Sequence, residues 1–339
     1  MQAAAADRTL DIVLCHRRLP AQPDAPHGAT RALTAAGHQV TEVADGPLDL
    51  RPGQVLWIQD NPNWFPTVLR QLRTTPRRSR PLTVLWFSEP LPPPSYARLP
   101  KPRLHLREIA KIALRDARMT DPYSNAARLR AIMREGLVDV LAASTPARCA
   151  WLGEHGIAAH FVPLGYVPED HGRDLGLERD IDVLFLGALV PRRRRLVAEL
   201  RRRGIDVRVE GSWSDPSTWG EARTRLLNRT RIYLNLARFP GELPGLRLIL
   251  GMASKALVVS EPIHAPGPYV PGTHFVACDA DNLPGTITHY LAHRSQRETI
   301  AAAGHELVTG TVTMKRSVDR LLGHVEAAAR RRRTAAAQP

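Results

Sequence analysis

A glycine that follows a short apolar stretch is the first feature of the sequence with a clear chemical use. The stretch IDVLFLG ends at Gly187, and four consecutive arginines, 192–195, follow at the start of a helical pattern. A strand, a glycine turn and a helix leave backbone N–H groups free at the helix start, and these bind phosphate together with guanidinium groups. We therefore predict that Arg192 or Arg193 binds the diphosphate of a nucleotide at this turn.

Two further apolar stretches in the same half of the chain, RIYLNLA and KALVVSE, have the pattern of buried strands. Ser260 and Glu261 end the second of them. In α/β sheets, ligands bind at the carboxyl ends of the strands. We expect these two residues to lie at the same nucleotide site.

Carboxylates and histidines follow the apolar stretches of the first half. Asp60 ends QVLWIQD, Glu89 follows PLTVLWFS, and His16 and His27 lie around the proline-rich loop after LDIVLC. Each is a candidate general base that would take a proton from a substrate hydroxyl. Asp60 is our first choice, followed by Glu89 and His27, and His27 is equally well explained as a helix cap. A reaction that retains configuration needs no such base, and the sequence leaves the stereochemistry open.

The sequence has no motif that requires a metal ion. Asp279 and Asp281 form a DxD pattern, but Asp281 precedes a helical stretch and is better explained as its N-cap. The three cysteines, Cys15, Cys149 and Cys278, are scattered and lack ligand spacing. The phosphate loop GxxxxGK[ST], the zinc motif HExxH and the nucleophile elbow GxSxG are missing from the sequence. We predict no metal and no cofactor, and the kinase and hydrolase classes are not favoured.

The elements that must position these residues suggest two α/β domains. The chain has 339 residues, and both halves alternate short apolar stretches with helical patterns, including one long helical pattern over 104–135. We predict two Rossmann-like domains facing a cleft. Their expected boundaries are 1–165 for the first domain, 166–180 for a polar linker, 181–312 for the second domain, 313–328 for a last helix and 329–339 for a disordered basic tail.

The composition is that of a globular protein with a strong positive charge. The formal net charge is +14, which raises nucleic acid as a partner. Nearly all the basic residues are arginine and no basic motif is interleaved with aromatic residues, so we expect no nucleic acid. The charge also suits an anionic nucleotide or an acidic membrane surface. With no apolar run of membrane-spanning length and no leader sequence, we expect a cytoplasmic protein with peripheral membrane contact possible.

Several stretches of the second half resemble a known family. VPLGYVPED, DIDVLFLGALVPRRRRLVAELRRRGIDV, LRLILGMASKALVVSEP and TITHYLAHRSQRETIAAAGHELV are similar to the C-terminal domain of GT-B glycosyltransferases, of the family-1 or family-4-like type found in CgeB-like proteins. The first half resembles the acceptor-binding domain of these enzymes in its architecture. The resemblance implies a nucleotide sugar held by the second domain, an acceptor held by the first, and a last helix that crosses back to the first domain.

The resemblance also implies roles for individual residues. Gly187 would lie against the diphosphate. Many related enzymes carry two glutamates eight positions apart before the last core strand, and this chain has Glu242 at the first position and Leu250 at the second. Arg247 and Glu261 would take over part of the contact with ribose or sugar hydroxyls.

Together these observations predict a metal-independent glycosyltransferase. Its donor would be a nucleotide-diphospho-sugar of the UDP, GDP or TDP type, and its acceptor a small molecule, a glycan or a lipid-linked molecule. The alternative is a non-catalytic nucleotide-sugar-binding protein on the same fold, which Leu250 in place of a carboxylate suggests.

Overall fold

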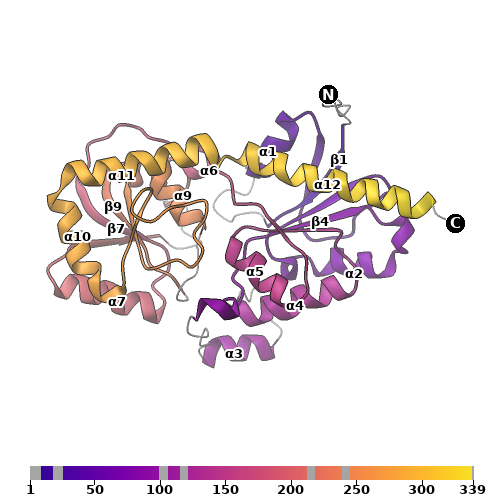
Figure 1. Cartoon of the computed structure of the whole chain (residues 1–339), viewed down its shortest axis with the longest axis horizontal. Helices are drawn as coiled ribbons and strands as arrows, with labels where there is room; N and C mark the ends of the chain where they lie inside the picture. The colour runs from indigo at the N-terminus through magenta and orange to yellow at the C-terminus, as the bar shows by residue number, and fades with distance from the viewer. Residues whose placement is uncertain are drawn as a thin grey trace.

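The computed structural model describes residues 9–17, 26–98, 106–114, 121–211, 218–238 and 245–337. The chain forms two lobes that lie side by side along the longest axis of the molecule (Figure 1). Each lobe is built on its own parallel β-sheet with helices on both faces. The central strands of such sheets are buried on both sides, which explains why they are almost continuously apolar in the sequence, whereas the edge strands β2 and β8 contain polar residues.

The first lobe has a six-stranded sheet with the order β2-β1-β3-β4-β5-β6. Its strands are β1 (Asp11–Cys15), β2 (Gln39–Val43), β3 (Val55–Gln59), β4 (Leu82–Phe87), β5 (Val140–Ala143) and β6 (His160–Phe161). Its helices are α1 (Gly28–Ala35), α2 (Pro66–Thr74), α3 (Leu106–Ala113), α4 (Pro122–Arg134) and α5 (Pro146–Glu154), with short 3-10 turns at η1 (Pro62–Trp64), η2 (Arg77–Ser79) and η3 (Ser95–Ala97). The long helical pattern predicted over 104–135 is thus two separate helices, α3 and α4.

Two hydrophobic cores fill the faces of this sheet. On one face, α1 and the C-terminal helix α12 (Met314–Ala337) pack against alternate residues of the strands. On the other face, α2, α4 and α5 pack against the remaining strand residues. The alternation follows from the period of two along a β-strand.

The second lobe has a five-stranded sheet with the order β11-β10-β9-β7-β8. Its strands are β7 (Ile181–Leu186), β8 (Val207–Glu210), β9 (Thr230–Asn235), β10 (Leu257–Ser260) and β11 (Val276–Ala277). Its helices are α7 (Pro191–Arg202), α8 (Gly220–Asn228), α9 (Gly245–Ala253), α10 (Leu283–Ala292) and α11 (Arg294–Glu306). A short 3-10 turn, η5 (Ala280–Asn282), precedes α10, and a π-helical turn, η6 (Leu307–Thr311), follows α11. Helices α7, α10 and α11 cover one face, and α8, α9 and η6 cover the other.

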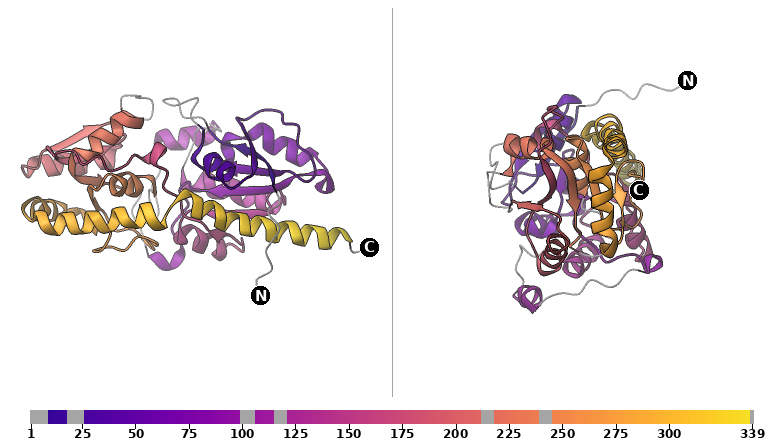
Figure 2. Two further views of the ribbon diagram at one scale, coloured as in Figure 1. Left: turned by 90° about the horizontal axis from the view of Figure 1, so that it is seen from above. Right: turned by 90° about the vertical axis from the view of Figure 1, so that its left-hand side faces the viewer.

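Two segments connect the lobes, and they run next to each other. One contains the short helix α6 (Pro168–His171), and the other leads into α12, which runs along the first lobe (Figures 1 and 2). Helix α12 extends from Met314 to Ala337 without interruption. It therefore includes most of the segment 329–339 that the sequence analysis predicts as a disordered tail.

Candidate functional site

The carboxyl ends of the two sheets face each other across the space between the lobes. Tyr96 follows β4 and His264 follows β10, and their ring centroids are 5.1 Å apart. Pro146 follows β5, and a Cβ built on Gly267 would lie 3.9 Å from its Cγ. Both sheets also change winding direction at this edge, between β1 and β3 and between β7 and β9. Ligands of doubly wound sheets bind at such switch points.

The Gly187 turn lies at this edge of the second sheet. Gly187 follows β7 with a φ of 120°, a conformation that side chains other than that of glycine rarely adopt. A Cβ at this position would lie 3.1 Å from Nη2 of Arg247. The guanidinium of Arg247 lies 5.6 Å from the ring centre of Phe185, the residue before Leu186. The structure thus brings a bare backbone turn and an arginine fork together, as a phosphate site requires.

The first two arginines of the run at the start of α7 are directed into the protein. Both Nη atoms of Arg192 donate to the carboxylate of Glu261, one of them at 2.7 Å from Oε2, and Nη1 also donates to the carbonyl of Ala237 at 3.1 Å. Hydrogen bonds to Glu261 raise the pKa of Arg192. Arg193 is buried, and its Nε donates to the carbonyl of Leu236 at 2.9 Å. In this structure both guanidinium groups contact the loop after β9, and the contact of Arg192 or Arg193 with a diphosphate stays a prediction.

Ser260 and Glu261 are buried, and they belong to the same hydrogen-bond network as Arg192. The Ser260 hydroxyl accepts a hydrogen bond from Asn235 Nδ2 at 2.9 Å and donates one to the Glu261 carbonyl at 2.7 Å. The Glu261 carboxylate accepts from Arg192 and, at 3.1 Å, from the backbone N–H of Ala237. Both side chains thus connect the carboxyl ends of β9 and β10, and their contact with a nucleotide stays a prediction.

Glu242 and Leu250 stand at the positions of the paired glutamates of related enzymes, and the structure describes only the second of them. Glu242 lies outside the described residues. Leu250 lies in α9, is 4% exposed and belongs to the core beneath the second sheet. A carboxylate at that position would be buried in an apolar core, so Arg247, on the preceding turn of α9, is the better placed polar residue.

Asp60 lies at the carboxyl edge of the first sheet, directly after β3. Its φ of 71° is in the left-handed region, which aspartate tolerates better than most residues. Its backbone N–H donates to the Trp86 carbonyl at 2.8 Å, and its carboxylate accepts a hydrogen bond from the Ser88 hydroxyl. Burial raises the pKa of the Asp60 carboxyl, although the bond from Ser88 opposes this. A carboxylate with a raised pKa at this edge suits a general base.

Glu89 lies two residues beyond the end of β4 and is half-buried. Its backbone carbonyl accepts a hydrogen bond from Nε of Arg148 at 2.7 Å. Arg148 also donates to the Ser144 hydroxyl at 3.0 Å, so this arginine ties the loops after β4 and β5 together. Glu89 remains the second candidate base.

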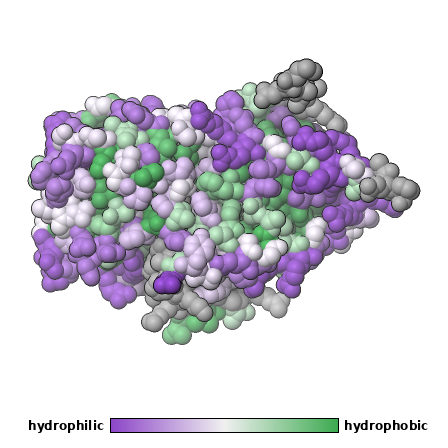
Figure 3. All heavy atoms as spheres, in the orientation of Figure 1, coloured by the Kyte–Doolittle hydropathy of each residue, from purple (hydrophilic) through white to green (hydrophobic). Residues whose placement is uncertain are grey.

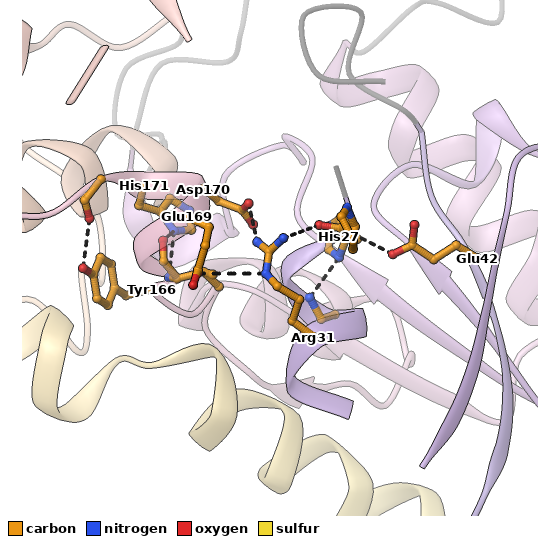
Figure 4. Close-up of polar contacts among 11 residues, drawn as sticks. His27, Arg31, Glu42, Tyr166, Glu169, Asp170 and His171 are labelled. Atoms are coloured by element: carbon orange, nitrogen blue, oxygen red, sulfur yellow. Dashed lines mark hydrogen bonds and ion pairs between the residues drawn. The ribbon is translucent and has the colours of Figure 1, made fainter. Parts of the chain in front are cut away.

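His27 is the N-cap of α1. Its Nδ1 accepts a hydrogen bond from the backbone N–H of Ala29 at 3.1 Å. The backbone N–H of His27 donates to Oε1 of Glu42 at 2.7 Å (Figure 4). Burial and the neighbouring His16 lower the pKa of His27 to about 3. A neutral ring that already accepts a hydrogen bond is a poor proton acceptor at neutral pH, so the structure favours the cap over the base.

Glu42 is the residue of this edge that the sequence analysis missed. Besides the His27 N–H, it contacts Nε2 of the buried His16, at 3.1 Å from Oε2. Burial alone would raise the pKa of Glu42, but hydrogen bonds from Thr30, His27 and His16 keep it below its ordinary value. Nothing in the sequence singles out Glu42, because its approach to His16 follows from the parallel pairing that sets Leu14 of β1 opposite Glu42 of β2.

The linker forms a polar junction with the first lobe. Arg31 of α1 pairs with the carboxylate of Asp170 in α6 and donates to the Pro26 carbonyl at 2.6 Å (Figure 4). A Cβ on Gly28 would lie 2.7 Å from Oδ2 of Asp170, so only glycine allows this approach. These contacts hold the start of α1 against the linker.

The DxD pattern does not form the cap that the sequence predicts. Asp279 is the N-cap residue of η5, Asp281 lies within that turn, and Asn282 is the N-cap residue of α10. The prediction of Asp281 as an N-cap is therefore wrong. Among the residues that the structure describes, no group of three His, Cys, Asp or Glu side chains is placed to hold a metal ion.

In the described parts of the chain, no helix combines the length and the apolar composition needed to cross a bilayer.

The Arg192–Glu261 pair gives a testable expectation for stability. Replacing Glu261 by glutamine should lower the free energy of unfolding of the second lobe by about 1–2 kcal/mol, because Arg192 loses its counter-charge. The effect is smaller than for a fully buried pair because the Arg192 side chain is 29% exposed. Urea unfolding followed by fluorescence measures it. Glu199→Gln removes a partly exposed carboxylate from the same helix as Arg192 and serves as the control, and equal effects of the two changes would contradict the expectation.

Comparisons with known proteins agree with this architecture. Residues 192–323 match a family model described as glycosyl transferase-like. HepE of Anabaena in complex with UDP-glucose superposes with a TM-score of 0.58 at 10% identity, over 94% of this chain and 100% of that one. Sucrose-phosphate synthase of Thermosynechococcus elongatus superposes with a TM-score of 0.57 at 14% identity, over 97% of this chain and 100% of that one. TarM gives 0.57 at 8% identity, over 80% of this chain and 55% of its own length. A search of curated protein sequences finds no match.

These comparisons confirm the predicted fold class, two Rossmann-like domains of the GT-B type with a C-terminal helix that crosses back. They also confirm the resemblance to glycosyltransferases, whereas the CgeB-like subgroup stays a prediction.

Proposed function

We propose that the protein is a glycosyltransferase that moves a sugar from a nucleotide-diphospho-sugar to an acceptor. The observation that carries the proposal is the Gly187 turn with the Arg247 guanidinium beside it, at the carboxyl edge of the second sheet. This edge faces the other lobe, and HepE, which has the same fold, is described in complex with UDP-glucose. The donor would therefore lie on the second lobe, and the acceptor on the carboxyl edge of the first.

Arg247 is the side chain that we assign to the diphosphate. Its planar fork binds two oxygens at once, and its charge stabilises the leaving nucleoside diphosphate without a metal ion. The bare Gly187 backbone allows the phosphates to approach. Arg193 and the Arg192–Glu261 pair hold the adjoining loops in place from below. Asp60 is the side chain that we assign to the acceptor hydroxyl, with Glu89 as the alternative.

Nucleotide binding tests the donor site. Calorimetry with UDP, GDP and TDP should show binding of at least one nucleotide, and Arg247→Ala should weaken it by a factor of about 10 to 100, as expected when hydrogen bonds to a charged group are lost. Arg203→Ala removes the same charge at the far end of α7, where Arg203 is exposed and pairs with Glu199 at 3.0 Å, and should leave the affinity unchanged. Failure of all three nucleotides to bind, or equal loss in both variants, would contradict the proposal.

A non-catalytic nucleotide-sugar-binding protein is the second candidate. The observation in its favour is Leu250, whose burial in the core leaves α9 without a second carboxylate at that position. It predicts nucleotide affinity without turnover. Hydrolysis of any nucleotide sugar, or sugar transfer to any acceptor, by the purified protein excludes it.

A further inference from the structure

The first lobe has a cavity at the amino-terminal edge of its sheet, opposite the edge that faces the second lobe. The cavity measures about 710 Å³, which is within the range of small-molecule sites. It lies between the end of α4, the turn that joins α5 to β6, and the last part of α12. Asp139 directly precedes β5 and His160 begins β6, whereas Asp60 follows the carboxyl end of β3. The cavity is therefore separate from the proposed donor and acceptor sites.

Arginine and histidine account for most of the polar side chains that line this cavity. They are Arg130 and Arg134 of α4, Arg331 of α12, and His155 and His160. Of the described residues that line it, only Asp139 is acidic, and Oδ2 of Asp139 already has partners. It lies 3.1 Å from Nη2 of Arg332 and accepts the backbone N–H of Thr83 at 2.8 Å. A cavity lined by one sign of charge concentrates ions of the opposite sign.

The three arginines of the cavity lack a counter-charge within the described chain. No salt bridge of the described residues involves Arg130, Arg134 or Arg331, and Glu135, beside Arg134, pairs with Arg73 at 2.6 Å. Like charges four residues apart on a helix destabilise it. The helix dipole favours Arg134 in the last turn of α4, but it does not account for Arg130 one turn earlier or for Arg331 on another helix. The arrangement indicates a ligand that supplies negative charge.

Two stacked histidines lie beside the arginines. The rings of His160 in β6 and His324 in α12 have centroids 3.6 Å apart and an interplanar angle of 13°. Burial lowers the pKa of His160, and the charges of His324 and Arg331 lower it further. Burial also lowers the pKa of His324, together with the charges of Arg320 and Arg331. Each neutral imidazole still carries one N–H group that can donate to an anion.

The end of α12 is fixed at this edge, so it holds its side of the cavity in place. Arg332 pairs with Asp139, and its Nη1 donates to the carbonyl of Arg80 at 3.2 Å. In Figure 1 this end of α12 lies at the end of the molecule farthest from the second lobe. The surface at that end of the molecule is mostly hydrophilic (Figure 3).

We propose that this cavity binds a small molecule that carries two or more phosphate groups, at a site apart from that of the nucleotide sugar. Arg130, Arg134 and Arg331 pair with the phosphate oxygens, which the planar guanidinium group can bind two at a time. A single phosphate is too small to meet three arginines that come from two helices. Most of the remaining lining is apolar and accommodates the organic part of the molecule: Met133, Leu141, Ile157 and Ala158.

A small molecule fits this site better than a nucleic acid. Proteins that bind single-stranded nucleic acid combine a basic groove along the backbone with aromatic side chains on which the bases stack. Here the arginines surround a closed-in volume, and the lining residues include no Phe, Tyr or Trp within the described chain. The inference does not depend on the proposed sugar transfer, so the two can fail separately.

Calorimetry with inorganic pyrophosphate tests the proposal on the full chain. The titrations use Arg247→Ala as the parent protein, so that the proposed donor site contributes little to the binding. The parent should bind pyrophosphate, and should bind inorganic phosphate much more weakly. Adding Arg130→Ala and Arg134→Ala should weaken pyrophosphate binding at least about ten-fold, because hydrogen bonds from two charged groups are lost. Both side chains are exposed and alanine favours a helix, so the circular dichroism spectrum and the thermal midpoint should be kept.

A matched control separates this site from general attraction between a basic protein and an anion. Arg202→Ala with Arg203→Ala removes the same charge from the exposed end of α7 and should leave pyrophosphate affinity unchanged. Absence of pyrophosphate binding, an equal loss in both double variants, or equal affinities for phosphate and pyrophosphate overturns the proposal. Binding of a long RNA without binding of pyrophosphate also overturns it.

A second comparison keeps this proposal distinct from the proposed function. With Arg247 intact, Arg130→Ala together with Arg134→Ala should leave the affinity for the donor nucleotide unchanged, since the cavity lies at the opposite edge of the first sheet. A parallel loss of nucleotide affinity in this variant would show that the two sites are not separate and would overturn the proposal.

Discussion

Replacing Asp60 by asparagine is expected to lower the turnover number by a factor of about 10²–10⁴, the usual contribution of a general base. Asparagine has nearly the same shape, tolerates the left-handed backbone that Asp60 adopts, and still accepts the hydrogen bond from Ser88. It cannot take a proton. Nucleotide affinity should therefore stay unchanged while sugar transfer falls.

The pH dependence of wild-type activity provides a second measure of the same role. Burial raises the pKa of Asp60 above its ordinary value of 3.8. Because the carboxylate is the active form of a base, kcat/KM should rise with pH through that raised pKa, and this acidic limb should be missing from the residual activity of Asp60→Asn. The exposed Asp49, which pairs with Arg51, provides the control Asp49→Asn.

The outcome also separates the candidates that the sequence left open. If Asp60→Asn keeps nearly full turnover and the acidic limb, Asp60 is not the base, and Glu89→Gln becomes the next variant to measure. If neither change lowers turnover, the reaction needs no base on the first lobe, as expected for retention of configuration.

Much of the fold could be predicted because local rules and tertiary structure agree along the strands. IDVLFLG is apolar except for Asp182, and QVLWIQD contains the unbroken apolar run 55–58; as β7 and β3 they are central strands covered on both faces. The missed break between α3 and α4 had a local signal as well. Asp121 accepts the N–H groups of Tyr123 and Ser124, and Pro122 is the first residue of α4, which is the common pattern of a helix start.

The candidate site was harder to predict because its contacts join distant parts of the chain. The strand ends identify Gly187 and Asp60, whose places at the carboxyl edges follow from local sequence. The sequence does not reveal that Arg192 pairs with Glu261, since this depends on β9 lying between β7 and β10. The link between His16 and Glu42 likewise needs the register of β1 and β2.

Replacing Gly165 by alanine is expected to have the largest effect on stability, because Gly165 lies where the two connections between the lobes touch. A Cβ at this position would lie 2.3 Å from both the N and the Cα of Met314. The neighbouring Tyr166 donates to the Val312 carbonyl at 2.7 Å and accepts the N–H of Met314 at 2.9 Å. Backbone atoms held in this way cannot move aside, so we expect a loss of about 3 kcal/mol or more.

The loss should be greatest where α12 meets the first lobe. Met314 begins α12, and Val318, Leu321 and Val325 follow it into the core of that lobe. Gly165→Ala should therefore speed amide hydrogen exchange along α12 more than along α7 of the second lobe, since an opened crossing uncovers the apolar side of α12 first. Gly153→Ala in α5 is the control: a Cβ there would meet nothing within 4 Å, and alanine in a helix should stabilise by up to about 1 kcal/mol. Wild-type exchange along α12 in Gly165→Ala would show that the first lobe holds this helix without help from the crossing.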